Sequence, residues 1–316
     1  MRTISEAARW LQARDRFLIL THRRPDGDTI GSAIALCIGL RKLGKDAWIW
    51  ENPQFTPRYA ARLAGLTRKT VDRNAVIVAV DLASEGLLPN GGEQFAGKIQ
   101  LCLDHHPSNS GYAAETLVQA ECAACGELIW DLLVEMTAPI DPAMAEALYI
   151  AIATDTGCFR FSNTTARTFR TAAKAVEHKA QIAPINREFF EIKTKGRLQL
   201  EARLMENMEF YGGGKVAIAC LPQKWVEELG VTEDDLDSIS GFPRTIEGVC
   251  VGVLLRNSEP GRVKMSVRTA TGYNASEYCQ KLGGGGHVAA AGCSVLGTLE
   301  LGKRQILKVL KDANVI

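Results

Sequence analysis

The sequence carries almost no net charge, since 37 basic and 36 acidic side chains give +1 over 316 residues. Without an overall positive field, the protein is not expected to bind long nucleic acid, although a local site could hold a short anion. The chain also lacks an apolar run of the roughly 18 residues that cross a bilayer. Its N-terminus, MRTISEAARWLQARDRFLIL, has no signal-peptide core. We therefore expect a cytoplasmic protein without membrane contact.

The cysteines lack any framework of paired spacings. Nine are scattered along the chain, a pattern that favours buried free thiols in a reducing compartment over disulfides. One CxxC, CAAC at 122–125, lies in the helical-looking CAACGELIWDLLVEM, and no second pair follows. We interpret these cysteines as core residues rather than as zinc or redox ligands.

The first half of the chain alternates short apolar runs with amphipathic segments. RFLIL, DAWIW, AVIVAV and KIQLCL are typical of buried strands. The segment TIGSAIALCIGLRKLG predicts a helix, with Asp28 as its N-cap and Gly44 as its stop. This alternation predicts an α/β fold with a mainly parallel sheet and helices on both faces.

The pattern changes in the second half. NREFFEIKTKGRLQLEARLMENMEFY predicts a charged helical connector, and hairpin signals follow, with Gly212 to Gly214 as a turn. GVCVGVLLRN and RVKMSVRT predict strands separated by SEPG. We expect domains over 1–185 and 211–316, joined by a helical linker over 186–210, the second being a smaller α/β domain across a cleft.

Acidic and imidazole side chains follow the predicted strands. His22 follows FLIL, Asp81 ends AVIVAVD, and Asp104, His105 and His106 end IQLCLDHH. In an open α/β sheet, ligands bind beyond the carboxyl ends of the strands, so these side chains are expected to converge. Asp155, where an apolar helical run stops, needs a partner for its charge.

The carboxylates of this set carry a charge that suits two divalent cations. The four aspartates are Asp26, Asp28, Asp81 and Asp155. Carboxylates with imidazoles suit Mn²⁺ or Mg²⁺, and two such ions about 4 Å apart stabilise phosphoryl transfer. Singly, each residue also fits a structural role, such as a helix cap. Together they favour a metal centre for phosphoester hydrolysis.

A second signal lies near the C-terminus. Arg268 ends VKMSVR, and KLGGGGHVAAAG follows. The glycines Gly283, Gly284, Gly285 and Gly286 would let backbone amides approach an anion, with His287 as a further donor. Arg268 could bind a phosphate bidentately. The alternative is a flexible loop before a helix of small residues.

These motifs resemble a known family. HRRPDGDTIGS, VAVD, DHHP and ATDTGCFRFSNTT resemble, in order, the four motifs of the DHH phosphoesterases. SVRT and GGGGHVAAAG resemble the DHH-associated C-terminal domain. Length and layout are most similar to the NrnA type, cytoplasmic enzymes that degrade very short RNA and dephosphorylate pAp, the phosphoadenosine phosphate of sulfur metabolism.

The resemblance implies a role for each matching position. His22, Asp26 and Asp81 would hold one cation, and Asp28, Asp81, His105 and Asp155 the other, with Mn²⁺ expected and Mg²⁺ or Co²⁺ as alternatives. His106 would face the scissile phosphate, and Asp104 would orient the histidines. Arg268, Gly283 to Gly286 and His287 would bind the substrate's phosphates and nucleotide in the interdomain cleft.

The implied activity is hydrolysis of short oligoribonucleotides to nucleoside monophosphates, together with removal of the 3′-phosphate of pAp. A phosphodiesterase for linear dinucleotides derived from cyclic messengers is an alternative with the same chemistry. A RecJ-type exonuclease, an inorganic pyrophosphatase and a non-enzymatic nucleotide-binding module are less favoured. The sequence leaves open the preferred substrate, the cleavage direction, the native metal and whether the protein is a homodimer.

Overall fold

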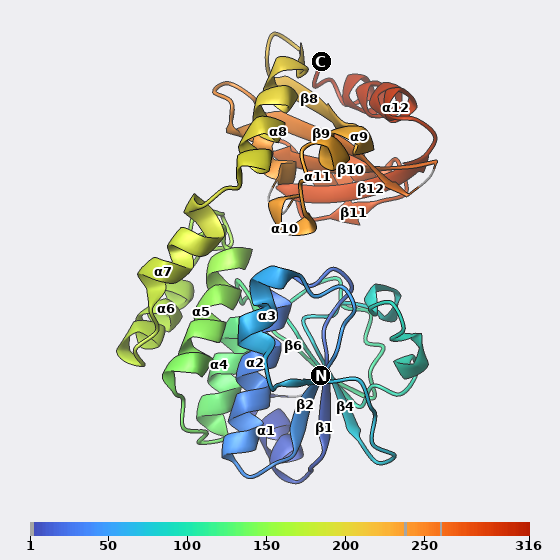
Figure 1. The fold of residues 1–316 in the computed structure, drawn as a ribbon. Helices are drawn as coiled ribbons and strands as arrows, with labels where there is room; N and C mark the ends of the chain where they lie inside the picture. The colour runs from blue at the N-terminus through green and yellow to red at the C-terminus, as the bar shows by residue number, and fades with distance from the viewer. Residues whose placement is uncertain (1–2, 237–238, 260) are drawn as a thin grey trace. The chain divides into compact units, whose positions relative to one another are not determined.

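The computed structural model describes residues 3–236, 239–259 and 261–316. The chain divides into two compact units, Met1–Ile192 and Lys193–Ile316, and each has its own sheet (Figure 1).

The first unit is built on a six-stranded, all-parallel sheet of order β3-β2-β1-β4-β5-β6. The four predicted strands are confirmed as β1 (Phe17–Leu20), β2 (Ala47–Trp50), β4 (Val76–Val80) and β5 (Leu101–Asp104). The edge strands β3 (Thr67–Arg68) and β6 (Glu115–Val118) were not predicted. Every residue of β1 and β5 is buried, as continuous apolar runs in a parallel sheet require.

Helices cover the two faces of this sheet differently. One face packs against α-helices, which form the largest core with it. They are α1 (Ile4–Gln12), α2 (Gly27–Lys42), α3 (Pro57–Leu63), α4 (Cys125–Glu135), α5 (Pro142–Asp155), α6 (Ala166–Glu177) and α7 (Ile182–Asn186). The other face is covered by the segment with the 3₁₀ helices Glu85–Leu87 and Glu93–Phe95, through Leu88, Phe95 and Ile99 (Figure 1). The predicted α/β class is confirmed.

The N-cap of helix α2 lies two residues before the predicted one. Asp26, not Asp28, is the N-cap: its backbone is extended, and its side chain accepts hydrogen bonds from the amides of Asp28 and Thr29. Asp28 lies in the first turn, so its carboxylate is available for other contacts. The predicted stop is confirmed, because Gly44 follows the C-cap Leu43 with φ of +78°.

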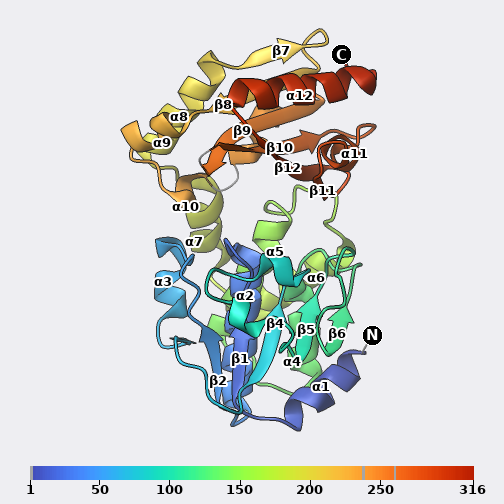
Figure 2. The same ribbon diagram turned by 90° about the vertical axis from the view of Figure 1, so that its right-hand side faces the viewer.

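The second unit contains a six-stranded mixed sheet of order β11-β12-β10-β9-β8-β7, in which only the β8–β9 pair is parallel (Figure 2). The strands are β7 (Glu209–Tyr211), β8 (Val216–Leu221), β9 (Val251–Glu259), β10 (Arg262–Thr269), β11 (Gly285–Gly286) and β12 (Ala290–Leu296). Helices α11 (Ala275–Gln280) and α12 (Leu299–Asp312) pack on one face, and α8 (Lys195–Glu206) on the other. Short helices α9 (Gln223–Glu228), α10 (Glu233–Leu236) and a 3₁₀ segment, Ile239–Thr245, complete it. Pro260, in the predicted SEPG turn, lies outside the described residues.

The predicted helical linker over 186–210 is helical over most of its length, but it is interrupted at 192–194 and ends in a strand. A π-helix, Arg187–Glu191, ends where Ile192 becomes extended, and α8 begins afresh with Thr194 as its cap. Leu200 and Leu204 of α8 are buried against the second sheet, and the segment ends in strand β7. Packing on the second sheet therefore determines the path of this segment, and the charged composition of the segment gives no sign of that packing.

Among the helices of residues 3–236, 239–259 and 261–316, none combines the length and the apolar character needed to span a bilayer.

Candidate metal centre

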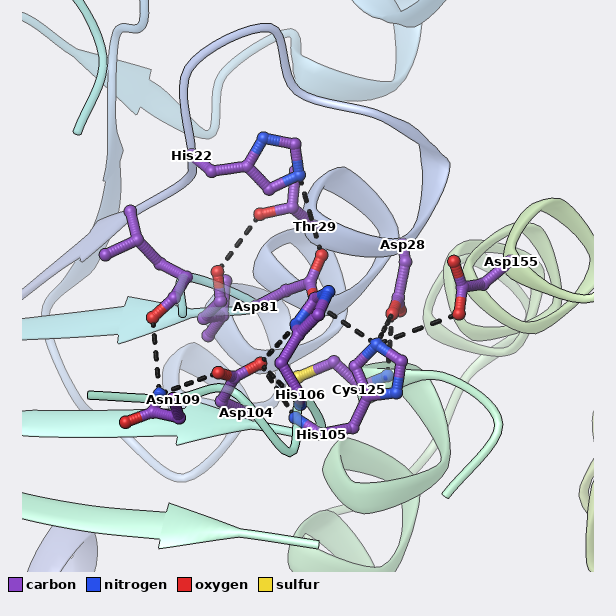
Figure 3. Close-up of polar contacts among 12 residues, drawn as sticks. His22, Asp28, Thr29, Asp81, Asp104, His105, His106, Asn109, Cys125 and Asp155 are labelled. Atoms are coloured by element: carbon purple, nitrogen blue, oxygen red, sulfur yellow. Dashed lines mark hydrogen bonds and ion pairs between the residues drawn. The ribbon is translucent and has the colours of Figure 1, made fainter. Parts of the chain in front are cut away.

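The carboxyl edge of the first sheet brings the predicted side chains together (Figure 3). His22 follows β1, Asp81 follows β4, and His105 follows the last residue of β5. Helix α2 adds Asp26 and Asp28 from its N-terminus, and α5 adds its last residue, Asp155. Adjacent parallel strands that end at one level thus bring together residues more than 130 positions apart in the chain, as predicted.

The first ligand group consists of His22, Asp26 and Asp81, whose potential ligand atoms lie within 4.8 Å of one another. Nε2 of His22 lies 3.5 Å from Oδ1 of Asp26 and 3.6 Å from Oδ2 of Asp81. The ring is oriented by a contact of 2.9 Å between its Nδ1 and the carbonyl oxygen of Arg23. These separations match ligands that share an ion at about 2.1 Å.

The second ligand group consists of Asp28, His105 and Asp155. Nε2 of His105 lies 3.6 Å from Asp28 Oδ2, 3.7 Å from Asp155 Oδ2 and 3.5 Å from Asp81 Oδ1. Within the described residues, His105 Nε2 and Asp81 Oδ1 are buried and have no hydrogen-bond partner. Buried polar atoms are rarely left unpaired, so the geometry fits a divalent cation between these groups.

Asp81 lies between the two groups and has an unusual backbone. Its φ of +53° is in the left-handed region, which residues other than glycine, asparagine and aspartate seldom adopt. Its amide donates to the carbonyl of Leu103 on the neighbouring strand, at 2.9 Å. Such strain is characteristic of functional positions, and here it accompanies a carboxylate that faces both His22 and His105.

The electrostatics of the cluster show an excess of buried negative charge. Burial and then the neighbouring Asp81 carboxylate raise the pKa of Asp28 well above its usual range, and burial followed by Asp26 and Asp81 does the same for Asp155. Burial would also raise the pKa of Asp26, but the adjacent His22 outweighs it and lowers that pKa to about 2. Bound cations would relieve this repulsion.

His106 forms a third group of possible ligands with Asp81 and His105, since its Nδ1 lies 3.4 Å from Oδ1 of Asp81, but its shorter contact is with Asp104. Its Nδ1 lies 2.8 Å from Oδ1 of the fully buried Asp104, which also accepts from the amides of His105 and His106. Burial would lower the pKa of His106, but the Asp104 hydrogen bond and the nearby carboxylates raise it to about 9. The other oxygen of Asp104 accepts from Nδ2 of Asn109 at 2.7 Å. Asn109 was missed in the sequence, although it follows within DHHPSN.

The candidate substrate residues of the second unit have contacts of their own. The Arg268 guanidinium, at the end of β10, donates to Ser240 Oγ at 2.9 Å and to the carbonyl of Val267 at 3.1 Å. The glycine run is not a free loop: Gly285 and Gly286 pair with β12 as strand β11. A Cβ at Gly284 would collide with the carbonyl oxygen of Gly292 and the side chain of Cys293.

This packing changes one prediction about the glycine run. The amides of Gly283, Gly284 and His287 donate to the carbonyls of Gln280, Cys279 and Ala290 at 2.8–3.0 Å. These three amides are therefore engaged within the unit rather than aimed at an anion, and Gly284 is required for close strand packing.

The cysteines are free and largely buried, as predicted. The expectation that CAAC lies inside a helix is wrong, because α4 begins only at Cys125. Burial raises the pKa of Cys122 to about 12 and that of Cys125 well above its usual range. Neutral thiols are poor metal ligands and nucleophiles, which supports a core role.

Comparisons with known proteins agree with this geometry. Residues 16–152 match the N-terminal domain of the DHH family, and residues 213–314 match the DHHA1 domain. The chain is 32% identical to the bifunctional oligoribonuclease and PAP phosphatase NrnA of Thermus thermophilus, over 99% of this chain and 94% of that one. It is 27% identical to the protein of the same name from Mycoplasma pneumoniae, over 98% and 95% of the two chains.

A solved structure confirms the fold over both units. An exopolyphosphatase-related protein from Bacteroides fragilis is similar with a TM-score of 0.86, at 21% identity, over 98% of this chain and 95% of that one. The family matches, the near-complete overlap with the relatives and the shared fold lead to one conclusion: this chain belongs to the DHH family, with a DHHA1 domain, and groups with the NrnA proteins.

Proposed function

We propose that this protein is a two-metal phosphodiesterase that hydrolyses very short oligoribonucleotides to nucleoside monophosphates and removes the 3′-phosphate of pAp. The observation that carries the proposal is the convergence of two histidine–aspartate groups on Asp81, with unpaired buried ligand atoms between them. The names of the NrnA relatives supply the substrate class.

The two ligand groups correspond to two cation sites. His22, Asp26 and Asp81 would hold one ion, and Asp28, Asp81, His105 and Asp155 the other. Mn²⁺ is the ion we propose, with Mg²⁺ and Co²⁺ as alternatives, because the ligands are carboxylates and imidazoles. When bound, such ions supply positive charge that stabilises the attacking and leaving oxygens of phosphoryl transfer.

His106 is the residue that we propose to act on the scissile phosphate. Its hydrogen bond to Asp104 fixes the plane of the ring, and Asn109 fixes Asp104 in turn. An imidazole held in this way can donate a hydrogen bond to a phosphate oxygen or a proton to the departing oxygen. Asp104 is then a positioning residue, buried so that its charge acts on His106 rather than on water.

Residues 211–316, within the second unit, are proposed to bind the substrate, while residues 1–185, within the first unit, carry the chemistry. Arg268 is the main candidate for a phosphate contact, because its bonds to Ser240 and Val267 hold the guanidinium in place. His287 and the Gly283–Gly286 segment would lie against the nucleotide.

The proposal is tested by initial rates on pAp, linear dinucleotides and RNAs of two to about twenty-four residues, with Mn²⁺ and Mg²⁺ compared. We expect the shortest RNAs and pAp to be cleaved and the long ones to be poor substrates. Equal or better cleavage of long RNA would contradict a preference for short substrates, and activity on dinucleotides alone would favour the narrower alternative. His106→Ala should lose activity. His178→Ala is the matched control and should keep it, because His178 lies at the C-terminal end of α6.

A further inference from the structure

Both oxygens of Asp28 are bonded to donors of the protein itself. Oδ2 accepts from the amide of Cys125 at 2.7 Å (Figure 3). Oδ1 accepts from the amide of Gly126 at 2.9 Å and from the hydroxyl of Ser32 at 3.2 Å. Asp28 is only 1% exposed, so water does not compete for these positions.

The count of lone pairs limits how Asp28 can bind an ion. Each carboxylate oxygen has about two acceptor positions. Oδ1 uses two for Gly126 and Ser32, whereas Oδ2 uses one for Cys125 and lies 3.6 Å from His105 Nε2. One position on Oδ2 therefore remains for an ion beside His105.

Helix α4 supplies two of these donors and is suited to do so. Its N-cap, Ala124, has no side-chain hydrogen bond, so the first amides of the helix are not satisfied by the helix's own cap. The carboxylate of Asp28, from α2, takes that place at the positive end of the helix.

Close packing fixes the distance between these helices. A Cβ added at Gly126 on α4 would lie 2.6 Å from the Cβ of Ala151 on α5. A Cβ added at Gly31 on α2 would lie 3.0 Å from the same atom of Ala151 and would collide with the carbonyl oxygen of Ala147. The backbones of α2, α4 and α5 thus meet with almost no side chain between them. Helix α5 ends in Asp155, the third member of the same ligand group.

We propose that Ser32 and Gly126 are positioning residues that make Asp28 a one-oxygen ligand, through Oδ2, for the ion of the His105 group. Ser32 holds Oδ1 directly, and Gly126 does so through its amide and by allowing α4 to approach α5. This rests on the proposed two-metal function, and it predicts that the two residues affect one ion and not the other.

The test is titration of the metal-free protein with Mn²⁺, with free Mn²⁺ followed by electron paramagnetic resonance. The wild type should bind two ions. In Ser32→Ala, the ion of the His105 group should bind about ten- to a hundred-fold more weakly, which is the usual effect of removing a hydrogen bond to a metal ligand. The ion of the His22 group should bind as in the wild type. Thr171→Val, which removes a buried hydroxyl of α6 that bonds only to the carbonyl of Arg167, is the control and should bind both ions normally.

Gly126→Ala provides an independent arm. The clash with Ala151 should displace the N-terminus of α4 and weaken the same ion, and adding Ala151→Gly should restore its affinity by removing the clashing atom. Unchanged affinities in Ser32→Ala, equal weakening of both ions, or no rescue by Ala151→Gly would overturn the positioning role while leaving the proposed function intact. A wild type that binds fewer than two Mn²⁺ would overturn both.

Discussion

Replacing Asp81 with asparagine removes a carboxylate that faces both histidine groups. Its Oδ2 lies 3.6 Å from His22 Nε2 and its Oδ1 lies 3.5 Å from His105 Nε2, so the change is expected to weaken both ion sites. Asparagine is chosen because residue 81 has φ of +53°, and asparagine adopts this left-handed conformation more readily than alanine. The variant should therefore keep the fold.

The expected effects on activity and on stability have opposite signs. Mn²⁺-dependent hydrolysis should fall by about 10³-fold or more, or about 4 kcal/mol of transition-state stabilisation. The metal-free variant should be at least as stable as the wild type, because the Asp81 charge is among the causes that raise the pKa of Asp28 and Asp155. Mn²⁺ at 100 times its Kd should add about 2.7 kcal/mol per site to the wild type, a gain that the variant should lose.

Initial rates on pAp and a diribonucleotide, with thermal unfolding measured with and without Mn²⁺, test both expectations. Asp131→Asn is the matched control, since Asp131 pairs with Arg167 on the helical side of the unit and should not affect the rates. Full activity of Asp81→Asn, or an undiminished stabilisation by Mn²⁺, would refute the bridging role.

Three further changes have defined outcomes. Asn109→Ala should lower kcat about ten-fold with little change in Mn²⁺ affinity, because it removes the hydrogen bond to one oxygen of Asp104. An unaltered kcat would contradict this expectation. Asp141→Ala should cost about 1 kcal/mol of unfolding free energy at pH 7, since Asp141 caps α5. Burial would raise the pKa of Asp141, but the hydrogen bond from the Met144 amide and the charge of Lys42 outweigh burial and lower it. The ionised Asp141 therefore contributes its full stabilisation above the ordinary carboxyl pKa. In urea titrations, the difference in unfolding free energy between wild type and variant should shrink below about pH 4. Gly284→Ala should destabilise the second unit by about 1–3 kcal/mol in calorimetry, because no space exists beside Gly292, and a wild-type unfolding temperature would contradict the packing.

Local patterns predicted much of the fold because the strands of the first sheet are short, continuous apolar runs. The runs around β1 and β4 are buried whatever their neighbours, so their boundaries follow from composition. The edge strands β3 and β6 were not predicted, since half-exposed residues such as Thr67 and Arg68 carry no apolar pattern. The charged segment over 186–210 was predicted as a helical connector, and its composition did not show that Leu200 and Leu204 of α8 pack on the second sheet.

The sequence by itself determined which strand-end residues meet at the centre, because a side chain just beyond a parallel strand lies at the carboxyl edge of the sheet. His22, Asp81 and His105 follow from that rule alone. Only the tertiary structure decided how each side chain is held. Asp28 looked like a helix cap, yet it accepts hydrogen bonds from α4, nearly 100 residues downstream, because glycines let those helices touch. Hydrogen-bond partners and close approaches depend on which backbones become neighbours, and local sequence patterns do not contain that information.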